Sequence, residues 1–294
     1  KGWSPCESKV KYDYDTDTGR LQNNGANELQ PGIILMVDAF GNVTRTRTNT
    51  TYELIKGQVK TNIVTTHTDV DNVDGSKAIT IRELDYDYDL ETTALIGVRN
   101  LRLGDGSVTL NGVTVKYNGG DDETVTVGVD CFGNYRVSYV ENHNLSPEES
   151  KGKTLIEWTK TTTNFTNVDG LRNQTVSYLH YNYNPETGRL EENNPVDNIY
   201  PETGQPYQLS ATVTVNEVTT THTVDISRRP DVDTVSLSSD IFGNSYWTET
   251  TNTYEDIAGE AKVVRATTIT HAENVDTSIS HSQITISYTY TTRV

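Results

Sequence analysis

The sequence is poor in the residues that build a large hydrophobic core or a membrane anchor. Only 33% of its 294 residues are hydrophobic, and it contains a single methionine. Each folded unit must therefore bury a thin core, as a β-sandwich or a stack of hairpins would. No run of about 18 apolar residues occurs, so we expect no membrane-spanning helix and no membrane insertion.

The first residues, Lys1 to Cys6, also lack the apolar core of a signal peptide. If the protein is secreted, this is the mature chain with its signal already removed. We expect an extracellular or cell-surface location on the strength of the features described below.

Basic residues are outnumbered by acidic ones. The chain has 24 Lys and Arg against 41 Asp and Glu, a formal net charge of −17. Phosphate recognition needs basic patches, so nucleic acid is not an expected partner. Anionic membrane surfaces are disfavoured for the same reason. The acidity has three possible explanations: solubility, calcium binding, or a role in a crowded extracellular matrix.

Cysteine is nearly absent. The two that occur, Cys6 and Cys131, are consistent with one disulfide in an oxidising compartment, either within one chain or between chains. Two free thiols are the alternative.

The sequence contains none of the familiar catalytic motifs. It has no His-Glu-x-x-His, no Gly-x-Ser-x-Gly and no phosphate-binding loop. His67, His222 and His271 recur in similar Thr-rich segments, which indicates a repeated packing or surface role. We therefore expect no catalytic residues and no enzyme. A polysaccharide hydrolase or lyase on a β-scaffold remains the alternative from that class.

What the chain does contain is typical of β-structure. Thr, Val, Ile and Tyr are abundant, and these residues favour a pleated, half-buried surface. Apolar and polar residues alternate through 284–290, which is the period of a strand with one buried face. No segment shows a convincing helical period. The sequence predicts an all-β fold.

A long-period repeat is the strongest feature. Its first marker, Asp-x-Phe-Gly-Asn, occurs at residues 38–42, 130–134 and 240–244. Two further markers follow each copy, Asn-Val-Asp at 72–74, 167–169 and 274–276, and Tyr-x-Tyr at 86–88, 181–183 and 288–290. The first tyrosine lies 12 residues after the aspartate in all three copies. This constant spacing predicts tandem sandwich-like units of roughly 100 residues.

Two segments carry a family resemblance. Residues 12–21 (Tyr-Asp-Tyr-Asp-Thr-Asp-Thr-Gly-Arg-Leu) and 181–190 resemble the YD (Rhs-type) repeat of bacterial surface and toxin-shell proteins, and residues 38–44 resemble its other half. The spacing is more similar to that of large secreted tandem-repeat proteins. The resemblance implies secretion, β-structure and a surface role, and implies no activity.

The repeat register predicts four segments. Residues 1–30 form an N-terminal half-repeat that lacks its upstream part, 31–128 and 129–238 form two units, and 239–294 form a third that lacks its tail. We expect a terminal strand of the same or a neighbouring subunit to complete the third unit. The expected donor residues are Val10, Tyr12 and Tyr14 at one end, and Ile284, Ile286, Tyr288 and Tyr290 at the other.

These features predict a structural subunit of an extracellular filament or surface matrix, whose main partner is a further copy of itself. Closure within one chain and ordinary terminal strands are the alternatives for the ends. A monomeric adhesin stalk or carbohydrate-binding module is the alternative function, with Trp3, Trp158 and Trp247 as sugar platforms or as packing residues.

Calcium and glycans are the expected surface chemistry. Hard oxygen ligands suit Ca²⁺, and two acidic clusters offer them, although neither matches a complete EF-hand loop. Their residues are Asp13, Asp15 and Asp17, and Asp69, Asp71 and Asp74. Covalent N-linked glycans are predicted at the sequons of Asn42, Asn49, Asn144, Asn164 and Asn173.

Overall fold

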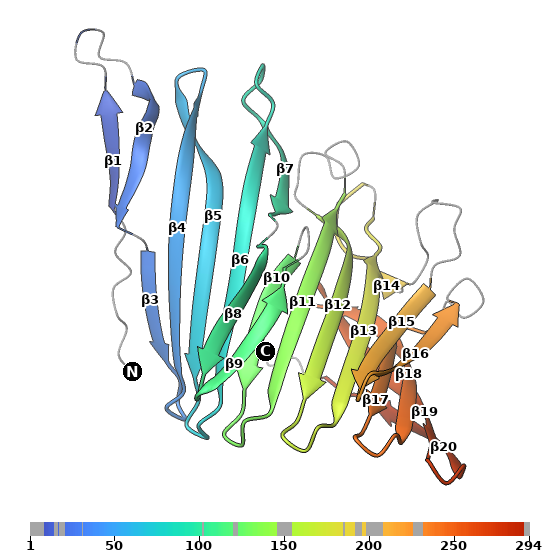
Figure 1. Cartoon of the computed structure of the whole chain (residues 1–294). Helices are drawn as coiled ribbons and strands as arrows, with labels where there is room; N and C mark the ends of the chain where they lie inside the picture. Colours follow the sequence, from blue (N-terminus) through green and yellow to red (C-terminus); the bar gives the residue numbers. More distant parts are fainter. Residues whose placement is uncertain are drawn as a thin grey trace. The chain divides into compact units, whose positions relative to one another are not determined.

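The computed structural model of the chain describes residues 9–14, 17, 21–30, 32–101, 103–119, 123–145, 155–184, 186–191, 196–197, 208–225 and 232–290. All regular structure within these ranges is β, which confirms the predicted fold class (Figure 1). No helix long and apolar enough to cross a membrane occurs there. The chain forms two compact units, Lys1–Leu155 and Ile156–Val294. The repeat boundaries at residues 31, 129 and 239 concern the sequence register and stay a prediction.

Unit 1 is an antiparallel sheet with a separate hairpin. The sheet has the strand order β1-β2-β4-β5-β6-β10-β11, with β3 also paired to β4 and β7 also paired to β6. Within the described ranges the remaining two strands, β8 and β9, pair only with each other. The strands are β1 (Lys9–Tyr14), β2 (Leu21–Gln30), β3 (Gly32–Val37), β4 (Val43–Ile55), β5 (Gln58–Asp71), β6 (Lys77–Tyr88), β7 (Leu95–Asn100), β8 (Asp105–Leu110), β9 (Val113–Asn118), β10 (Glu123–Val129) and β11 (Tyr135–Asn144).

Unit 2 repeats this plan. Its sheet has the order β12-β13-β17-β18-β19-β20, with the short β14 paired to β13, and β15 and β16 form a separate hairpin. The strands are β12 (Ile156–Thr166), β13 (Arg172–Tyr181), β14 (Val196–Asp197), β15 (Gln208–Val215), β16 (Val218–Asp225), β17 (Thr234–Ser239), β18 (Ser245–Ile257), β19 (Glu260–Glu273) and β20 (Ile279–Ser287).

Rows of hydroxyl side chains cross each sheet, because the register of strand pairing places Thr and Ser residues directly opposite one another on successive strands. In unit 1, Thr46 lies opposite Thr68, Thr68 opposite Thr80, and Thr80 opposite Thr126. The corresponding row in unit 2 is Thr163, Thr175, Ser236, Thr248, Thr270 and Ser282. Cross-strand Thr pairs stabilise sheets through packing and hydrogen bonds, which explains why so Thr-rich a chain forms strands.

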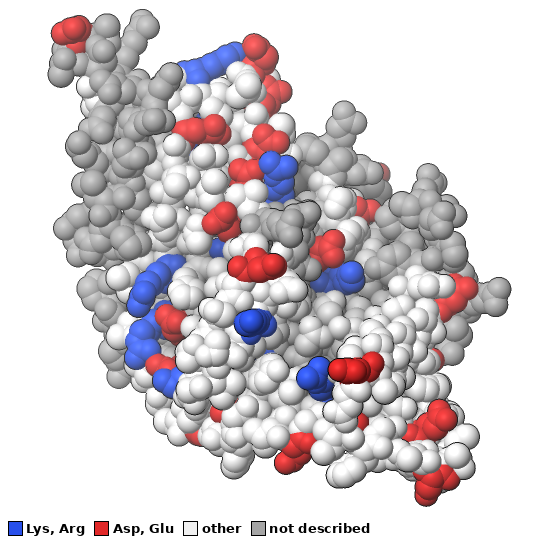
Figure 2. Space-filling view, viewed as in Figure 1, with Lys and Arg blue, Asp and Glu red and all other residues white. Residues whose placement is uncertain are grey.

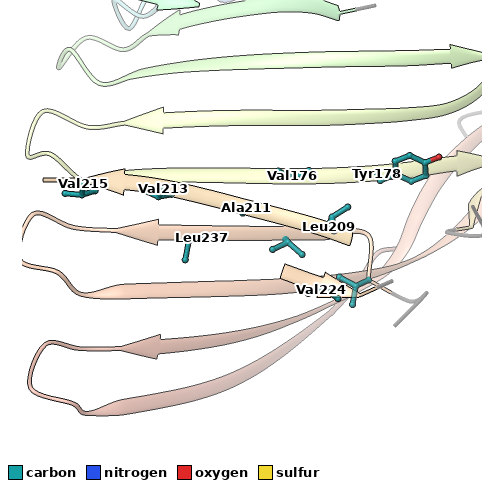
Figure 3. Packing of buried hydrophobic residues seen from close by; sticks show 10 residues of the cluster. Val176, Tyr178, Leu209, Ala211, Val213, Val215, Val224 and Leu237 are labelled. Atoms are coloured by element: carbon teal, nitrogen blue, oxygen red, sulfur yellow. The ribbon is translucent and has the colours of Figure 1, made fainter. Parts of the chain in front are cut away.

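The core of unit 2 lies where its hairpin covers one face of the sheet (Figure 3). Hairpin residues Leu209, Ala211, Val213 and Val215 alternate with exposed ones and face the sheet. They pack against Val176 and Tyr178 on β13 and against Val235 and Leu237 on β17. Alternation with a period of two therefore produces one apolar and one solvated face on the hairpin.

Unit 1 has a smaller core of the same kind. Leu110 and Val115 of the β8–β9 hairpin pack with Val125, Val127 and Val129 of β10. In the part of the chain that the structure describes, two-layer packing occurs at the hairpins, and most of the other sheet residues are half-exposed. This arrangement explains how a chain with so few hydrophobic residues folds: the apolar side chains are concentrated at two places.

Candidate functional site at the turns and strand edges

Each Asp-x-Phe-Gly-Asn marker forms the same tight turn. In the first copy, Asp38 Oδ1 accepts hydrogen bonds from the backbone N–H of Phe40 (2.8 Å) and Asn42 (2.9 Å), and Asn42 Nδ2 donates to Asp38 Oδ2 (2.7 Å). The copies at 130–134 and 240–244 repeat these three bonds. Gly41 has φ +94°, a left-handed conformation that other residues rarely adopt. The marker is therefore a turn that its own aspartate holds closed.

The Asn-Val-Asp markers form a second family of turns. Asp74 Oδ1 accepts the Ser76 N–H at 2.8 Å, and Asp276 does the same for Ser278 at 2.9 Å. Gly75 and Gly170 have positive φ, whereas Thr277 occupies the equivalent position in the last copy with φ 66°. A β-branched residue is strained there, so the last turn departs from the other two.

Turns of the two families lie side by side within each unit. The Val73 N–H donates to Asn42 Oδ1 at 3.0 Å in unit 1, and the Val275 N–H donates to Asn244 Oδ1 at 3.1 Å in unit 2. The turns therefore share one end of the sheet, at the lower end of the strands in Figure 1. Phe40 at the first tip is 82% exposed, and the other marker phenylalanines are similarly exposed.

Hydrogen bonds at these turns favour the ionised carboxylates. The side-chain hydrogen bond from Asn42 lowers the pKa of Asp38 most strongly, and backbone N–H groups lower it further. The pKa of Asp240 is lowered in the same way by Asn244. The hydrogen bonds that close the turn therefore depend on ionised aspartate.

β20 is an open edge strand. Among the described residues it pairs only with β19, and every residue from Ile279 to Tyr290 is exposed. The predicted donors Ile284, Ile286, Tyr288 and Tyr290 lie on or just beyond this strand. Tyr290 Oη donates to the Val263 carbonyl at 2.8 Å, which fixes the end of the segment to β19. An edge of this length and apolar content presents unpaired backbone groups to a further strand.

A second open edge, β3, was missed by sequence reasoning. It pairs only with β4 among the described residues, and its five consecutive apolar residues, Ile33 to Val37, are all exposed. The sequence does contain a signal for it: an uninterrupted apolar run directly before the first marker turn. β10 and β17, which precede the other two marker turns, carry buried residues at the same positions.

The predicted N-terminal donor pairs within its own chain. β1 lies antiparallel to β2, with Tyr12 opposite Ala26 and Tyr14 opposite Leu21. The Tyr14 side chain is exposed, whereas those of Val10 and Tyr12 lie outside the described residues. Exchange of this strand between subunits stays a prediction.

The calcium ligands predicted at the second marker serve other contacts. Asp71 forms ion pairs with Arg45 and with Lys77, the latter at 3.0 Å. Asp74 closes its own turn, and Asp69 lies within β5. In the first acidic cluster, Asp17 is exposed, while Asp15 and the Asp13 side chain lie outside the described residues. No cluster of three metal-ligating side chains occurs among the residues described. Calcium binding stays a prediction.

The five sequons differ in how their amides are engaged. Asn173 Nδ2 donates to Ser236 Oγ and Ser238 Oγ, both at 2.7 Å, and Asn144 Nδ2 donates to the Val98 carbonyl. Asn42 holds its turn closed, as described above, and Asn164 is half-buried and accepts from Gln174 Nε2 at 2.8 Å. Asn49 is exposed on β4 and makes no side-chain hydrogen bond within the described part of the chain.

The other predicted side chains have the following places. Cys131 is exposed in the second marker turn, and Cys6 lies outside the described residues, so a bond between them stays a prediction. Trp247 stacks between His222 and His271, with ring centroids 4.1 Å and 4.9 Å apart. Trp158 stacks on Tyr178 at 5.5 Å, and Trp3 lies outside the described ranges. Both described tryptophans therefore pack against the unit 2 core.

Acidic and basic side chains are interspersed over the described surface visible in Figure 2. The basic residues often lie beside acidic ones, as Arg99 does beside Asp85, where Nη2 and Oδ2 are 2.8 Å apart. No family model, curated protein or solved structure in the comparisons matches the chain.

Proposed function

We propose that the protein is a structural subunit of an extracellular filament or surface matrix, which assembles head to tail by β-strand pairing between copies and carries N-linked glycans. The observation that supports this most directly is β20. It is a nine-residue strand with no partner on one side among the described residues, and residues along its whole length are exposed. Exposed edges of this kind pair with other strands, and proteins that remain monomeric usually blunt them with Lys, Pro or bulges.

β20 carries none of these protective features. It contains neither lysine nor proline, and its pairing with β19 runs from Ile279 to Ser287 without a bulge. Strand addition would satisfy its backbone groups with main-chain hydrogen bonds, while alternate side chains supply specificity. The absence of a catalytic motif from the sequence and the β-only fold agree with a structural role.

The monomeric carbohydrate-binding alternative has less support. A sugar platform requires an aromatic face that is open to solvent. Both faces of Trp247 are stacked, by His222 and His271, and one face of Trp158 is stacked on Tyr178. An enzyme on this scaffold has no supporting observation among the described residues.

Negative-stain electron microscopy tests the proposal. The full chain should form filaments, and replacing β20 residues with Lys, as in Ile284→Lys together with Ile286→Lys, should leave monomers. Val218→Lys, at an exposed hairpin position, is the matched control that should keep filaments. Because β1 already pairs with β2, deletion of residues 1–22 should also keep them. Monodisperse monomers from the full chain under oxidising conditions, with and without calcium, would refute the proposed function.

A further inference from the structure

Two strand pairings inside the chain join segments that lie next to different marker turns, and each is called a joint below. In unit 1, β6 follows an Asn-Val-Asp turn, β10 precedes an Asp-x-Phe-Gly-Asn turn, and the two strands pair antiparallel with Ile79 opposite Val127. In unit 2, β13 and β17 hold the same places relative to these turns, and Gln174 lies opposite Leu237. Counted from the turn aspartates, both joints have the same register.

β20 and β3 also lie next to marker turns, but among the described residues neither takes part in a joint like β6–β10 or β13–β17. β20 follows the last Asn-Val-Asp turn, as β6 and β13 follow theirs. β3 precedes the first Asp-x-Phe-Gly-Asn turn, as β10 and β17 precede theirs. We propose that β20 of one copy pairs antiparallel with β3 of the next copy in the register of the internal joints. That register places His281 opposite Leu35, Ser282 opposite Ile34, and Ile279 opposite Val37.

The exposed side chains of β3 support this pairing, which rests on the proposed function and identifies the surface through which the filament grows. Ile33, Leu35 and Val37 correspond to Val125, Val127 and Val129 of β10, which are at most 2% exposed. In β3 the same positions are 38–57% exposed. In β10 the β8–β9 hairpin covers this face. Pairing with β20 would remove from water only the sides of Ile33, Leu35 and Val37 that flank the added strand, which contributes an apolar term to association.

The turns at the two ends fit each other in size. At the internal joints a glycine faces a larger residue of the neighbouring turn: a Cβ added to Gly75 would lie 3.3 Å from Cys131 Cβ, and one added to Gly170 would clash with Ile241 Cγ2. At the proposed joint the corresponding residues are Thr277 and Ala39. The larger side chain has thus moved to the other side of the contact, where a small alanine leaves room for it.

The hydroxyl rows give the distance expected across the joint. Thr80 Oγ1 and Thr126 Oγ1 are 2.9 Å apart, and the equivalent atoms of Thr175 and Ser236 are 3.1 Å apart. The hydroxyl row of unit 2 ends at Ser282 on β20. In unit 1, Ile34 on β3 lies opposite Thr46, the first hydroxyl residue of that row. The proposed register places Ser282 opposite Ile34. Pairing of the two edges would continue one row from copy to copy, with side chains at this position close enough for a disulfide.

Disulfide trapping tests the register. Ser282→Cys and Ile34→Cys are combined in a chain whose Cys6 and Cys131 are replaced by serine, and filaments are oxidised and run on a denaturing gel. A ladder of covalent oligomers is expected. Ser282→Cys with Met36→Cys, which is two residues out of register on the same face, is the matched control and should give at most a faint ladder.

A compensating pair of substitutions tests the turn contact. Ala39→Ile should clash with Thr277 of the neighbouring copy and raise the critical concentration for assembly roughly tenfold. Thr277→Gly in the same chain recreates the Gly170–Ile241 arrangement and should restore assembly, as measured by sedimentation. Ala39 is exposed, so the monomer should keep its melting temperature.

The outcomes separate this inference from the proposed function. Filaments that give a stronger ladder with the control pair, or no ladder with either pair, would overturn the β20–β3 register while leaving the filament role intact. Filaments indifferent to Ala39→Ile would also overturn the joint. Absence of filaments from the unaltered chain would overturn both.

Discussion

At the scale of single residues, the marker aspartates decide whether the turns stay closed. The Asp38 and Asp240 carboxylates accept two backbone N–H groups and one side-chain amide each, and these bonds lower the pKa of both residues. A depressed folded pKa means that the unfolded chain takes up protons more readily than the folded chain as the pH falls. The turns therefore contribute stability above the ordinary carboxylate pKa, and lose it as the pH falls through the lowered value.

The first prediction concerns this acid sensitivity. Asp240→Asn keeps the size of the side chain but directs an amide at Asn244, so the melting temperature at pH 7 should fall by about 2–4 °C. The difference from the unaltered chain should shrink as the pH falls below the ordinary carboxylate range and through the lowered pKa of Asp240, where the native aspartate also protonates. Calorimetry across this pH range measures both effects. Glu217→Gln, an exposed acid in a hairpin turn, is the control; an equal loss there would show that the effect is one of net charge.

The second prediction concerns the site of glycan attachment. An N-linked glycan occupies the side-chain amide nitrogen, and at Asn42, Asn144 and Asn173 that nitrogen donates to another group of the fold. Asn49 alone among the five combines exposure with an amide that makes no described hydrogen bond. Peptide mass spectrometry of protein from a secretory host should therefore find a glycan on Asn49, and Asn49→Gln should remove it. A glycan on Asn173 in folded protein would contradict this reasoning.

Sequence reasoning located these residues but not their roles. The recurring Asp-x-Phe-Gly-Asn pattern predicted a repeated structural element, and the structure gives the reason for each of its polar residues. Asn42 shows why a short motif is ambiguous: the same three letters that define a sequon also close a turn. The hydrogen bonds to Asp38 and from Val73 show the role of Asn42 in the turn, and its glycosylation stays a prediction.

At the scale of secondary-structure elements, the hairpins stabilise the sheets. The β15–β16 hairpin contacts the sheet through its apolar face and through polar links from β13: Gln174 Oε1 accepts the Thr212 N–H at 2.8 Å, and Arg172 Nη1 donates to the Thr214 carbonyl at 2.7 Å. Its cluster contains ten buried residues, so it is the largest apolar core among the described parts of the chain.

The third prediction tests this dependence on the hairpin. Leu237 lies beneath the hairpin and is 1% exposed, so Leu237→Ala should lower the free energy of unfolding by about 2–5 kcal/mol. Val218→Ala, at the exposed tip of the same hairpin, should change it by less than about 0.5 kcal/mol. Urea unfolding measures both. Similar small losses in the two variants would mean that the hairpin contributes little to the stability of unit 2.

The strands themselves could be predicted more fully than their partners. Alternation through 284–290 and the spacing of turn markers predicted β-structure, because both follow from local geometry. The buried face expected for 284–290 was wrong, because every residue from Ile279 to Tyr290 is exposed. The edge character of β3 could not be read in this way: Ile33 to Val37 form a continuous apolar run, which is equally typical of a buried central strand. Which strand lies beside it depends on pairings between residues distant in sequence.

At the scale of the whole molecule, pairing of β20 with β3 is a contact between two different surfaces of the subunit. When two copies meet through such a heterologous contact, one copy keeps β3 unpaired and the other keeps β20 unpaired. Each added copy therefore presents a new open edge. Contacts between identical surfaces, such as β20 with β20, would instead stop at a dimer. The two arrangements predict different behaviour when one edge is blocked.

The fourth prediction uses two blocked variants. Ile33→Lys with Leu35→Lys places charge on β3 but leaves β20 open, and His281→Lys with Gln283→Lys does the reverse; charged edges resist strand addition. Each variant alone should be a monomer, because its open edge finds no partner edge in another identical copy. Mixed in equal amounts, they should form a single species of twice the 32.7 kDa chain mass and no filament, as light scattering coupled to gel filtration would measure. The β3-blocked variant is the decisive sample: if it dimerises alone, β20 pairs with itself, and the protein ends as a closed dimer instead of growing along one direction.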